Sequence, residues 1–323
     1  MVMLPEPRYR PPFPFTNGHV QTIYPTLFRS VPRLDPVRER LETPDGDFVD
    51  IDHHYCPDMR SDKVVIISHG LEGNSRKKYP LGMAAHLTRL GWDAVCLNFR
   101  GCSGEPNRLL RFYHSGVTDD LHTVLCHVLD KGDYTTAALV GFSMGGNQTL
   151  KYLGEQPDKV PRQVRKAVVF SVPCDLASSA HKLARPLNRI YMYYFMKGLK
   201  EKIRVKARQY PGSIDTTSLA NMISFAPFDD AYTAPIHGFR DAADYYSRCS
   251  SKQFLRAIRV RTLVVQAADD PFLPASCYPQ LEAQYNPHLF LEIPAHGGHV
   301  GFIGEDGSHT YWSEERAGRF LSE

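Results

Sequence analysis

The sequence predicts an α/β fold with a mostly parallel central sheet and helices on both faces. Short apolar runs such as Val64–Ile67 and Ala94–Phe99 are typical of strands that are buried on both faces. Segments with helical spacing, such as Tyr79–Leu90, separate these runs. Strands that alternate with helices in this way pair in parallel, because each helix carries the chain back across one face of the sheet.

Composition and charge exclude several classes of protein. The 323 residues are 42% hydrophobic and 23% charged, which suits one globular domain over 1–323. A net charge of +3 is too small to indicate a nucleic-acid partner. The seven scattered cysteines include no Cys-x-x-Cys pair, so we expect reduced thiols and a cytoplasmic protein. No apolar run approaches the roughly 18–20 residues that span a bilayer, and the proline-rich segment Met1–Phe15 lacks the apolar core of a signal peptide.

Two elements are predicted before the first buried strand. The segment 15–24 is expected to wrap the core as a short helix and loop. The segment 39–52 has alternating strands around an Asp45-Gly46 turn, which predicts an antiparallel hairpin. Asp52, His53 and His54 follow, and they suit either a metal site or a half-exposed strand; we favour the strand.

The later part of the chain resumes the alternation around one interruption. We expect a helix from the N-cap Thr118 to about Asp130, then a strand and the start of its following helix over 137–148, and then a strand at 167–172. The segment 173–255 breaks the rhythm with aromatic helical material, so we predict a helical cap over the carboxyl edge of the sheet. Strands at 262–268 and 289–293 and a closing helix at 311–321 complete the fold.

A Gly-x-Ser-x-Gly motif follows an apolar run and precedes a helical segment. This strand–turn–helix context is that of a nucleophile elbow, in which Ser143 projects its hydroxyl from a strained turn. Side chains at Gly141 and Gly145 would collide with the strand–helix crossing, so glycine is expected there. The helix N-terminus also favours a developing oxyanion.

Acidic and basic partners for this serine follow two later strands. Active residues gather at the carboxyl ends of parallel strands, and the order Ser, Asp, His is that of α/β-hydrolases. We favour Asp270 over Asp269 because it directly precedes Pro271 in a typical acid loop, and His299 over His296 because it lies deeper in its loop. The alternatives Asp269 and His296 stay open at this stage.

The predicted chemistry also needs two backbone donors for the oxyanion. We expect the N–H groups of Met144, which follows the nucleophile, and of Leu71, which follows His69-Gly70. His69 itself is interpreted as a residue that packs in the turn. His114 and Asp119 fit an H-x4-D pattern associated with some acyltransferases, although Asp119 also suits the first turn of a helix.

A basic, aromatic stretch within the predicted cap raises the question of a membrane. Nine basic residues lie between Lys182 and Arg208, and Ile190, Tyr193, Tyr194 and Lys197 follow helical spacing. Such a segment is able to rest weakly on an anionic membrane surface without inserting. The alternative, which we favour, is a lid helix with a solvated basic flank.

Several motifs together resemble the YheT-like α/β-hydrolases, from about Phe15 to the C-terminus. They are His69–Gly73, Asn98–Asn107, Tyr113–Gly116, Gly141–Asn147, Phe228–Asp230, Ile236–Phe239, Ala268–Phe272 and His296–Phe302. The resemblance implies a catalytic triad of Ser143, Asp270 and His299, carboxylesterase or lipase activity, and neither a metal nor an organic cofactor.

We therefore expect a serine hydrolase that cleaves small acyl esters, of short to medium chain or derived from lipids, through an acyl-enzyme. An acyltransferase that uses the same acyl-enzyme and a non-catalytic binding module on this scaffold are the alternatives. The sequence predicts no oligomeric state.

Overall fold

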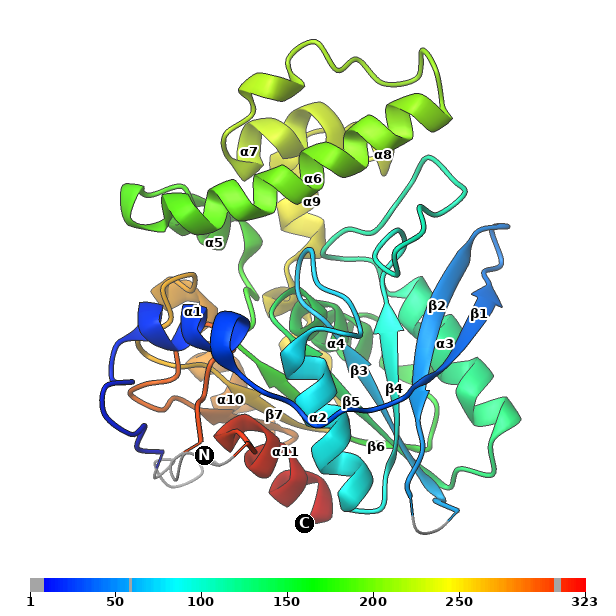
Figure 1. Ribbon diagram of the computed structural model, residues 1–323, viewed down its shortest axis with the longest axis vertical. Coiled ribbons are helices and arrows are strands. Elements are labelled where there is room, and N and C mark those ends of the chain that lie inside the picture. Colours follow the sequence, from blue (N-terminus) through cyan, green and yellow to red (C-terminus); the bar gives the residue numbers. More distant parts are fainter. Residues whose placement is uncertain (1–8, 58–59, 305–308) are drawn as a thin grey trace.

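A computed structural model describes residues 9–57, 60–304 and 309–323 as an eight-stranded sheet flanked by helices (Figure 1). The order of the strands is β1-β2-β4-β3-β5-β6-β7-β8. The six strands from β4 to β8 pair in parallel, and only the β1–β2 and β2–β4 pairs are antiparallel. The predicted α/β fold with a mostly parallel sheet is therefore confirmed.

The strands are short, and their ends lie within about three residues of the predicted ones. Their bounds are β1 Val37–Glu42, β2 Phe48–His54, β3 Lys63–Ser68, β4 Asp93–Asn98, β5 Thr136–Phe142, β6 Val164–Phe170, β7 Arg261–Val265 and β8 Leu289–Glu292. The predicted hairpin is formed by β1 and β2.

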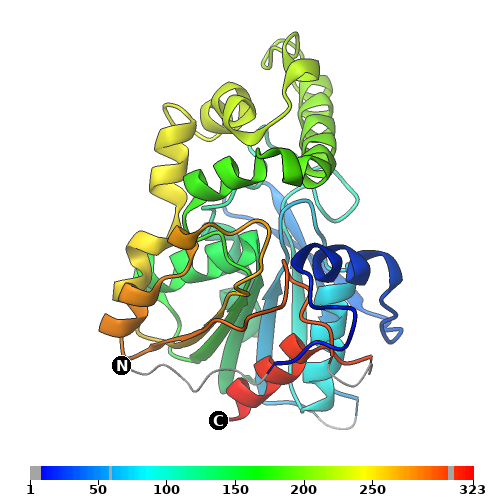
Figure 2. The same ribbon diagram turned by 90° about the vertical axis from the view of Figure 1, so that its left-hand side faces the viewer.

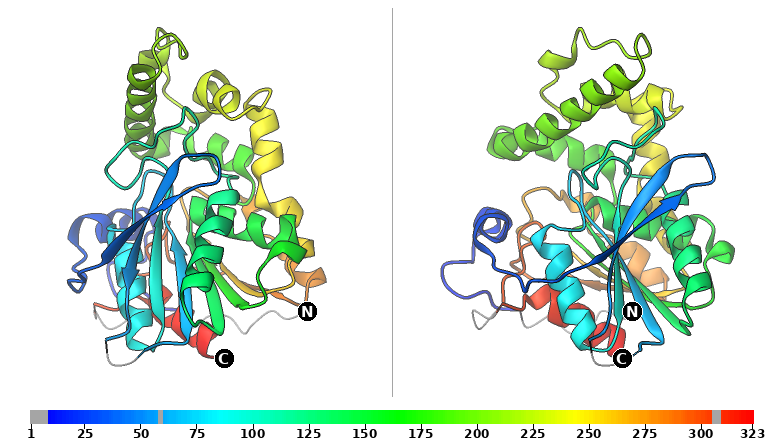
Figure 3. Two further views of the ribbon diagram at one scale, coloured as in Figure 1. Left: turned by 90° about the vertical axis from the view of Figure 1, so that its right-hand side faces the viewer. Right: turned by 45° about the vertical axis from the view of Figure 1, so that its right-hand side comes forward.

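Helices cover both faces of the sheet, as Figure 3 shows. The helices α3 (Asp119–Lys131) and α4 (Met144–Glu155) bury apolar side chains against one face. The helices α2 (Lys78–Arg89) and α11 (Trp312–Ser322) pack against the other face. Each buried strand supplies both cores, because successive side chains point to opposite faces; Val64 and Ile66 join the first core, whereas Val65 and Ile67 join the second.

The segment between β6 and β7 forms a separate layer of helices above the sheet (Figures 1 and 2). It contains α5 (Leu176–Leu183), α6 (Arg189–Gln209), α7 (Phe225–Phe228), α8 (Ala234–Ile236) and α9 (Ala242–Cys249). We call residues 173–255 the cap segment. The small helix α10 (Gln280–Tyr285) lies between β7 and β8.

The N-terminal helix α1 (Gly18–Phe28) packs on the loops that follow β7 and β8. The Asn17 side chain caps it by accepting hydrogen bonds from the amides of His19 and Val20. A Cβ at Gly18 would lie 2.1 Å from the carbonyl oxygen of Asp269, so this approach requires glycine. Of the proline-rich segment 1–15, residues 1–8 lie outside the described part of the chain. None of the described helices is both long and apolar enough to cross a membrane.

Candidate active site

Ser143 stands in a strained turn between β5 and α4. Its backbone has φ 52° and ψ −116°, a conformation that residues other than glycine rarely adopt. A Cβ at Gly141 would lie 2.6 Å from the carbonyl oxygen of Gly145, and a Cβ at Gly145 would lie 2.5 Å from the carbonyl oxygens of Ser68 and His69. The predicted crowding at the strand–helix crossing is confirmed.

Ser143, His299 and Asp270 meet at the carboxyl edge of the sheet. Ser143 Oγ lies 2.8 Å from His299 Nε2, and His299 Nδ1 lies 2.9 Å from Asp270 Oδ2. The Asp270 side chain is fully buried, and its Oδ1 accepts a hydrogen bond of 2.7 Å from the amide of Phe272. The Phe272 ring stacks on the imidazole at 4.1 Å. This arrangement fixes the imidazole in one plane and leaves Nε2 to receive the serine proton.

The two alternative residues pair with each other instead. His296 Nδ1 lies 3.4 Å from Asp269 Oδ2, and this histidine side chain is 35% exposed. Asp269 Oδ1 accepts a hydrogen bond from the amide of Gly298, and burial raises the pKa of Asp269. Asp269 thus holds the backbone of the His299 loop, whereas the imidazole of His299 contacts Asp270.

The turn after β3 brings Leu71 next to the serine. A Cβ at Gly70 would lie 3.2 Å from Ser143 Cβ, so the turn approaches the elbow closely. Leu71 and Met144 both line the cavity that contains Ser143. Within the described residues, neither the amide of Leu71 nor that of Met144 donates to a protein acceptor. Two free donors therefore lie beside the nucleophile.

His69 and two tyrosines hold this turn in place. The amide of Phe99 donates to His69 Nε2 at 3.2 Å, so Nδ1 carries the hydrogen and donates to the Gly70 carbonyl at 2.7 Å. Burial lowers the pKa of His69 to about 3, which keeps the ring neutral. The hydroxyl of Tyr79 accepts from the Gly70 amide, and that of Tyr113 accepts from the Glu72 amide. The structure thus agrees with the packing role predicted for His69.

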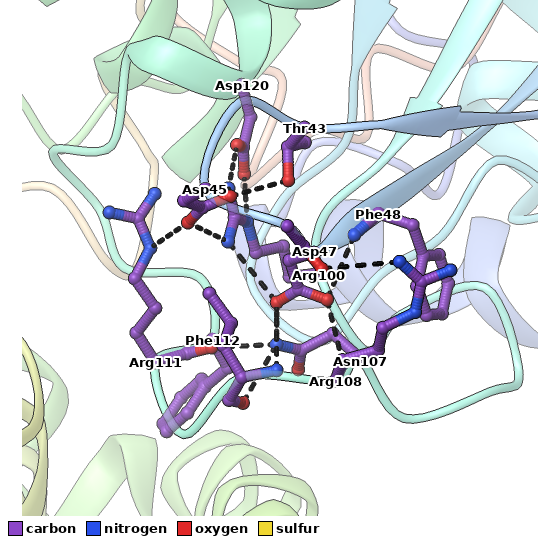
Figure 4. Close-up of polar contacts among 12 residues, drawn as sticks. Thr43, Asp45, Asp47, Phe48, Arg100, Asn107, Arg108, Arg111, Phe112 and Asp120 are labelled. Carbon is purple, nitrogen blue, oxygen red and sulfur yellow. Dashed lines mark hydrogen bonds and ion pairs between the residues drawn. The ribbon is translucent and has the colours of Figure 1, made fainter.

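A buried ionic network fixes the loop after β4, which forms one wall of the site (Figure 4). The Arg100 guanidinium bonds the carboxylates of Asp45, Asp47 and Asp120. Asp47 is fully buried and also accepts hydrogen bonds from the Asn107 side chain and the Arg108 amide. Because each buried charge has partners, the network holds the loop as one unit.

Two cavities meet at Ser143. An inner pocket of about 100 Å³ lies under the cap segment, and a more open cleft of about 640 Å³ runs toward α1 and α2. Both are lined by Leu71, Ser143, Phe195, Phe272 and His299. An ester whose carbonyl reaches Ser143 therefore has two places for the groups on either side of the carbonyl.

Sequence reasoning missed several of these lining residues. Thr22 of α1 accepts a hydrogen bond from the His299 amide at 2.9 Å, and Asp229 of the cap segment lines the inner pocket. Burial raises the pKa of Asp229 to about 6, while Thr233 and Tyr246 donate to its carboxylate. For Asp229, the only sequence feature that pointed to the site is the Phe228–Asp230 motif. The helical pattern in 15–24 does not indicate that Thr22 contacts His299.

The H-x4-D motif of His114 and Asp119 and the run Asp52-His53-His54 are not arranged as the sites that their patterns suggested. His114 lines the inner pocket, but Asp119 is exposed at the start of α3 and pairs with Arg111 at 2.7 Å. In the strand β2, Asp52 binds Arg38, and His54 is buried. This strand is more buried than the predicted half-exposed one, since His53 is half-buried and its other residues are buried. Across the described residues, no cluster of His, Cys, Asp or Glu is arranged to hold a metal ion.

Part of the predicted basic flank of the cap segment is not solvated. Lys182, Lys202 and Lys206 point inward and donate to backbone carbonyls, including those of Asp270, Gly101 and Asn107. Burial lowers the pKa of Lys206 to about 8. These lysines tie the cap to the loops of the site, so they do not form part of a solvated basic flank.

Comparisons with known proteins agree with this architecture. A family model of the alpha/beta hydrolase fold matches residues 63–213. The chain is 38% identical over 312 residues to "Putative esterase YheT" of Escherichia coli (strain K12), covering 95% of this chain and 91% of that protein. It is 30% identical over 290 residues to the mouse phospholipase ABHD3, covering 88% of this chain and 70% of that protein.

Solved structures show the same fold. The Pyrococcus furiosus esterase Pf2001 superposes with a TM-score of 0.59 at 17% identity, covering 91% of this chain and 97% of that one. The match to YheT extends over nearly the whole of both chains. The chain therefore belongs to the YheT-like family and is a hydrolase of the α/β-hydrolase superfamily.

Proposed function

We propose that the protein is a serine hydrolase of carboxylic esters and that Ser143, His299 and Asp270 are its catalytic triad. The observation that carries this proposal is the continuous contact from Ser143 Oγ to His299 Nε2 at 2.8 Å and from His299 Nδ1 to Asp270 at 2.9 Å. These distances suit proton transfer, and the chain of contacts ends where two cavities meet.

In the proposed mechanism, Ser143 Oγ attacks the carbonyl carbon of the ester while His299 Nε2 takes its proton. The negative charge that develops on the carbonyl oxygen is stabilised by the N–H groups of Leu71 and Met144. His299 then protonates the departing alcohol, which leaves an acyl-enzyme on Ser143. A water molecule, deprotonated by His299, releases the acid, and Asp270 stabilises the imidazolium at each step.

The two cavities support esters with an apolar group as substrates. The inner pocket is lined mainly by apolar side chains of the cap segment, such as Leu183, Leu199 and Phe225, but its volume of about 100 Å³ suits only a short group. The open cleft has room for a longer chain. Two relatives are named phospholipase and, in Saccharomyces cerevisiae at 28% identity, monoacylglycerol lipase. We therefore propose short- to medium-chain or lipid-derived acyl esters.

A fluorophosphonate probe tests the nucleophile. We expect one label per molecule of the wild type, none in Ser143→Ala, and full labelling in Ser179→Ala, which removes another serine hydroxyl of the inner pocket. Hydrolysis of a soluble short-chain ester should fall by several orders of magnitude only in Ser143→Ala. Labelling of the Ser143→Ala variant, or more than about a tenth of the activity in it, would contradict the proposal.

The identity of the acyl acceptor is read from the products. With glycerol added to the reaction, we expect free acid to remain the main product, because the proposed mechanism uses water. Predominant transfer of the acyl group to glycerol would instead identify the protein as an acyltransferase.

A further inference from the structure

Two helices far apart in the sequence present exposed apolar side chains. In α1, Leu27 is 61% and Phe28 68% exposed. At the start of α6 and just before it, Leu187 is 83%, Ile190 66% and Tyr193 71% exposed. Large apolar side chains at these levels of exposure are unfavourable in water unless another apolar phase covers them.

These two helices lie together on one side of the molecule. The ring of His19 in α1 stacks on that of Tyr191 in α6, and the two side chains share a hydrogen bond of 3.0 Å. Lys77, just before α2, donates to the hydroxyl of Tyr194, and Lys78 donates to the carbonyl of Leu27. Figures 1 and 2 show α1 below the first turns of α6 in both views. We call the exposed side chains of Leu27, Phe28, Leu187, Ile190, Tyr193 and Tyr194 the rim.

The rim adjoins the open cleft of the proposed active site. Leu27, Ile190 and Tyr194 line the cleft that reaches Ser143 and His299. Phe28, Leu187 and Tyr193 do not line it but are exposed near them in the sequence. An apolar group that binds in this cleft therefore contacts part of the rim.

Positive charge accompanies the rim. Arg185, Arg189 and Lys197 are exposed next to the apolar residues of α6, and the cleft is lined by Arg76, Lys77 and Lys78. The one carboxylate among the described residues that line the cleft is Glu72, which accepts a hydrogen bond from Tyr113. The surface thus combines exposed apolar and basic groups, the combination that anionic lipid interfaces attract.

We propose that the rim docks on an anionic lipid surface and lets lipid esters pass from that surface into the cleft. A partner protein seated on the rim would close the cleft to substrate, whereas a lipid surface supplies the substrate from the same side. The choice of lipid ester as cargo rests on the proposed function, but docking itself does not require catalysis. The basic residues involved are Arg185, Arg189 and Lys197 rather than the inward lysines Lys202 and Lys206.

Flotation with lipid vesicles tests the proposal on the full-length protein. The wild type should bind vesicles that contain phosphatidylglycerol, bind pure phosphatidylcholine much less, and detach as salt rises, because about 0.1 M salt screens charges beyond ~10 Å. The Ser143→Ala variant should bind like the wild type, so a failure of docking and a failure of the proposed catalysis are distinguishable.

Two triple variants and matched controls locate the surface. Phe28→Ser/Leu187→Ser/Tyr193→Ser and Arg185→Gln/Arg189→Gln/Lys197→Gln should each weaken binding by at least about tenfold, with hydrolysis of a soluble short-chain ester unchanged. The apolar control is Leu281→Ser/Tyr285→Ser on α10, and the basic control is Lys159→Gln/Arg162→Gln/Arg165→Gln near the start of β6. Both change exposed residues elsewhere on the molecule. They should bind like the wild type.

Three results would overturn the proposal. The first is a wild type that does not bind phosphatidylglycerol vesicles at low salt. The second is a pair of rim variants that bind as tightly as the controls. The third is a wild-type dimer in solution that the rim variants convert to a monomer, since the rim would then be an interface between two copies of the chain.

Discussion

Adjacent residues in the loop after β7 have opposite environments. The carboxylate of Asp270 is fully buried against His299, whereas Asp269 contacts the partly exposed His296 and the amide of Gly298. Asp270 thus contacts the imidazole beside the serine, whereas its neighbour Asp269 contacts only the loop.

The first prediction compares these two aspartates. Asp270→Asn should lower kcat by about 10³–10⁴-fold, because an amide cannot hold the imidazole in the required tautomer. Asp269→Asn should lose less than about tenfold, since it changes only the support of the loop. Steady-state kinetics on a soluble ester measure both, and unfolding curves verify that the variants are folded. Equal losses in the two variants would show that the contacts do not separate their roles.

The second prediction concerns the amide of Leu71. Leu71→Pro removes the N–H donor and should lower kcat by about 10²–10³-fold. Leu71→Ala keeps the donor and should change kcat by less than about fivefold, with the same melting temperature to within a few degrees. If Leu71→Ala loses as much activity as Leu71→Pro, the side chain matters and the oxyanion role is unsupported.

At the scale of elements, the cap segment is held to the proposed site by lysines inside it. Lys182 of α5 donates to the carbonyls of Asp270 and Leu273 at 2.8 and 2.6 Å, and burial lowers its pKa. Lys202 and Lys206 of α6 donate to carbonyls of the loop after β4. The cap segment therefore covers two loops and also supports them: the loop that carries Asp270 and the loop after β4 that forms a wall of the pocket.

The third prediction tests this support through Lys182. Lys182→Met leaves two carbonyls without their donor, so we expect kcat to fall by about 10–100-fold with KM nearly unchanged, and the free energy of unfolding to fall by about 2 kcal/mol. Lys182→Arg should recover part of kcat, because a guanidinium is able to reach both carbonyls. Lys200→Met, which removes a contact of a more exposed lysine to Ala220, is the matched control. A large loss of kcat in that control would contradict the assignment to Lys182.

Helices and strands were predictable from the sequence, because their signals lie within a few neighbouring residues. Contacts between distant residues were not predictable, because they depend on how the whole chain folds. The motif around Ser143 and the apolar runs indicate strand, turn and helix because the glycines and the periodicity lie within a few residues. The pairing of His299 with Asp270 required the geometry of two loops, so sequence position alone left Asp269 and His296 open. Thr22 and Asp229 carry no local signal of their contacts, since these arise only when α1 and the cap segment pack around the sheet.

At the scale of the whole molecule, the buried His69 and the half-buried His86 and His114 are held neutral. Burial lowers the pKa of His69 to about 3 and that of His86 to about 4, and it lowers the pKa of His114 well below its usual value. In the unfolded chain these groups take up a proton near pH 6.5. The unfolded state therefore binds more protons than the folded state below that pH, so the stabilising contribution of each histidine is lost as the pH falls from about 6.5 toward its folded pKa. Burial raises the pKa of Asp229 to about 6 and also raises the pKa values of Asp120, Asp269 and Glu314, so these carboxyl groups oppose the trend.

The fourth prediction is a loss of stability in mild acid that depends on these histidines. The free energy of unfolding should fall between pH 6.5 and 4, by at most about 1.4 kcal/mol per pH unit for a buried neutral histidine and by less for the half-buried His86. His86 lies where α2 packs on Gly318 of α11, outside the cavities that contain Ser143. His86→Gln should make the decline less steep without changing ester hydrolysis at pH 7.5. Urea unfolding at several pH values measures both slopes. A variant whose stability falls as steeply as that of the wild type would mean that the pKa of His86 is the same in the folded and the unfolded protein.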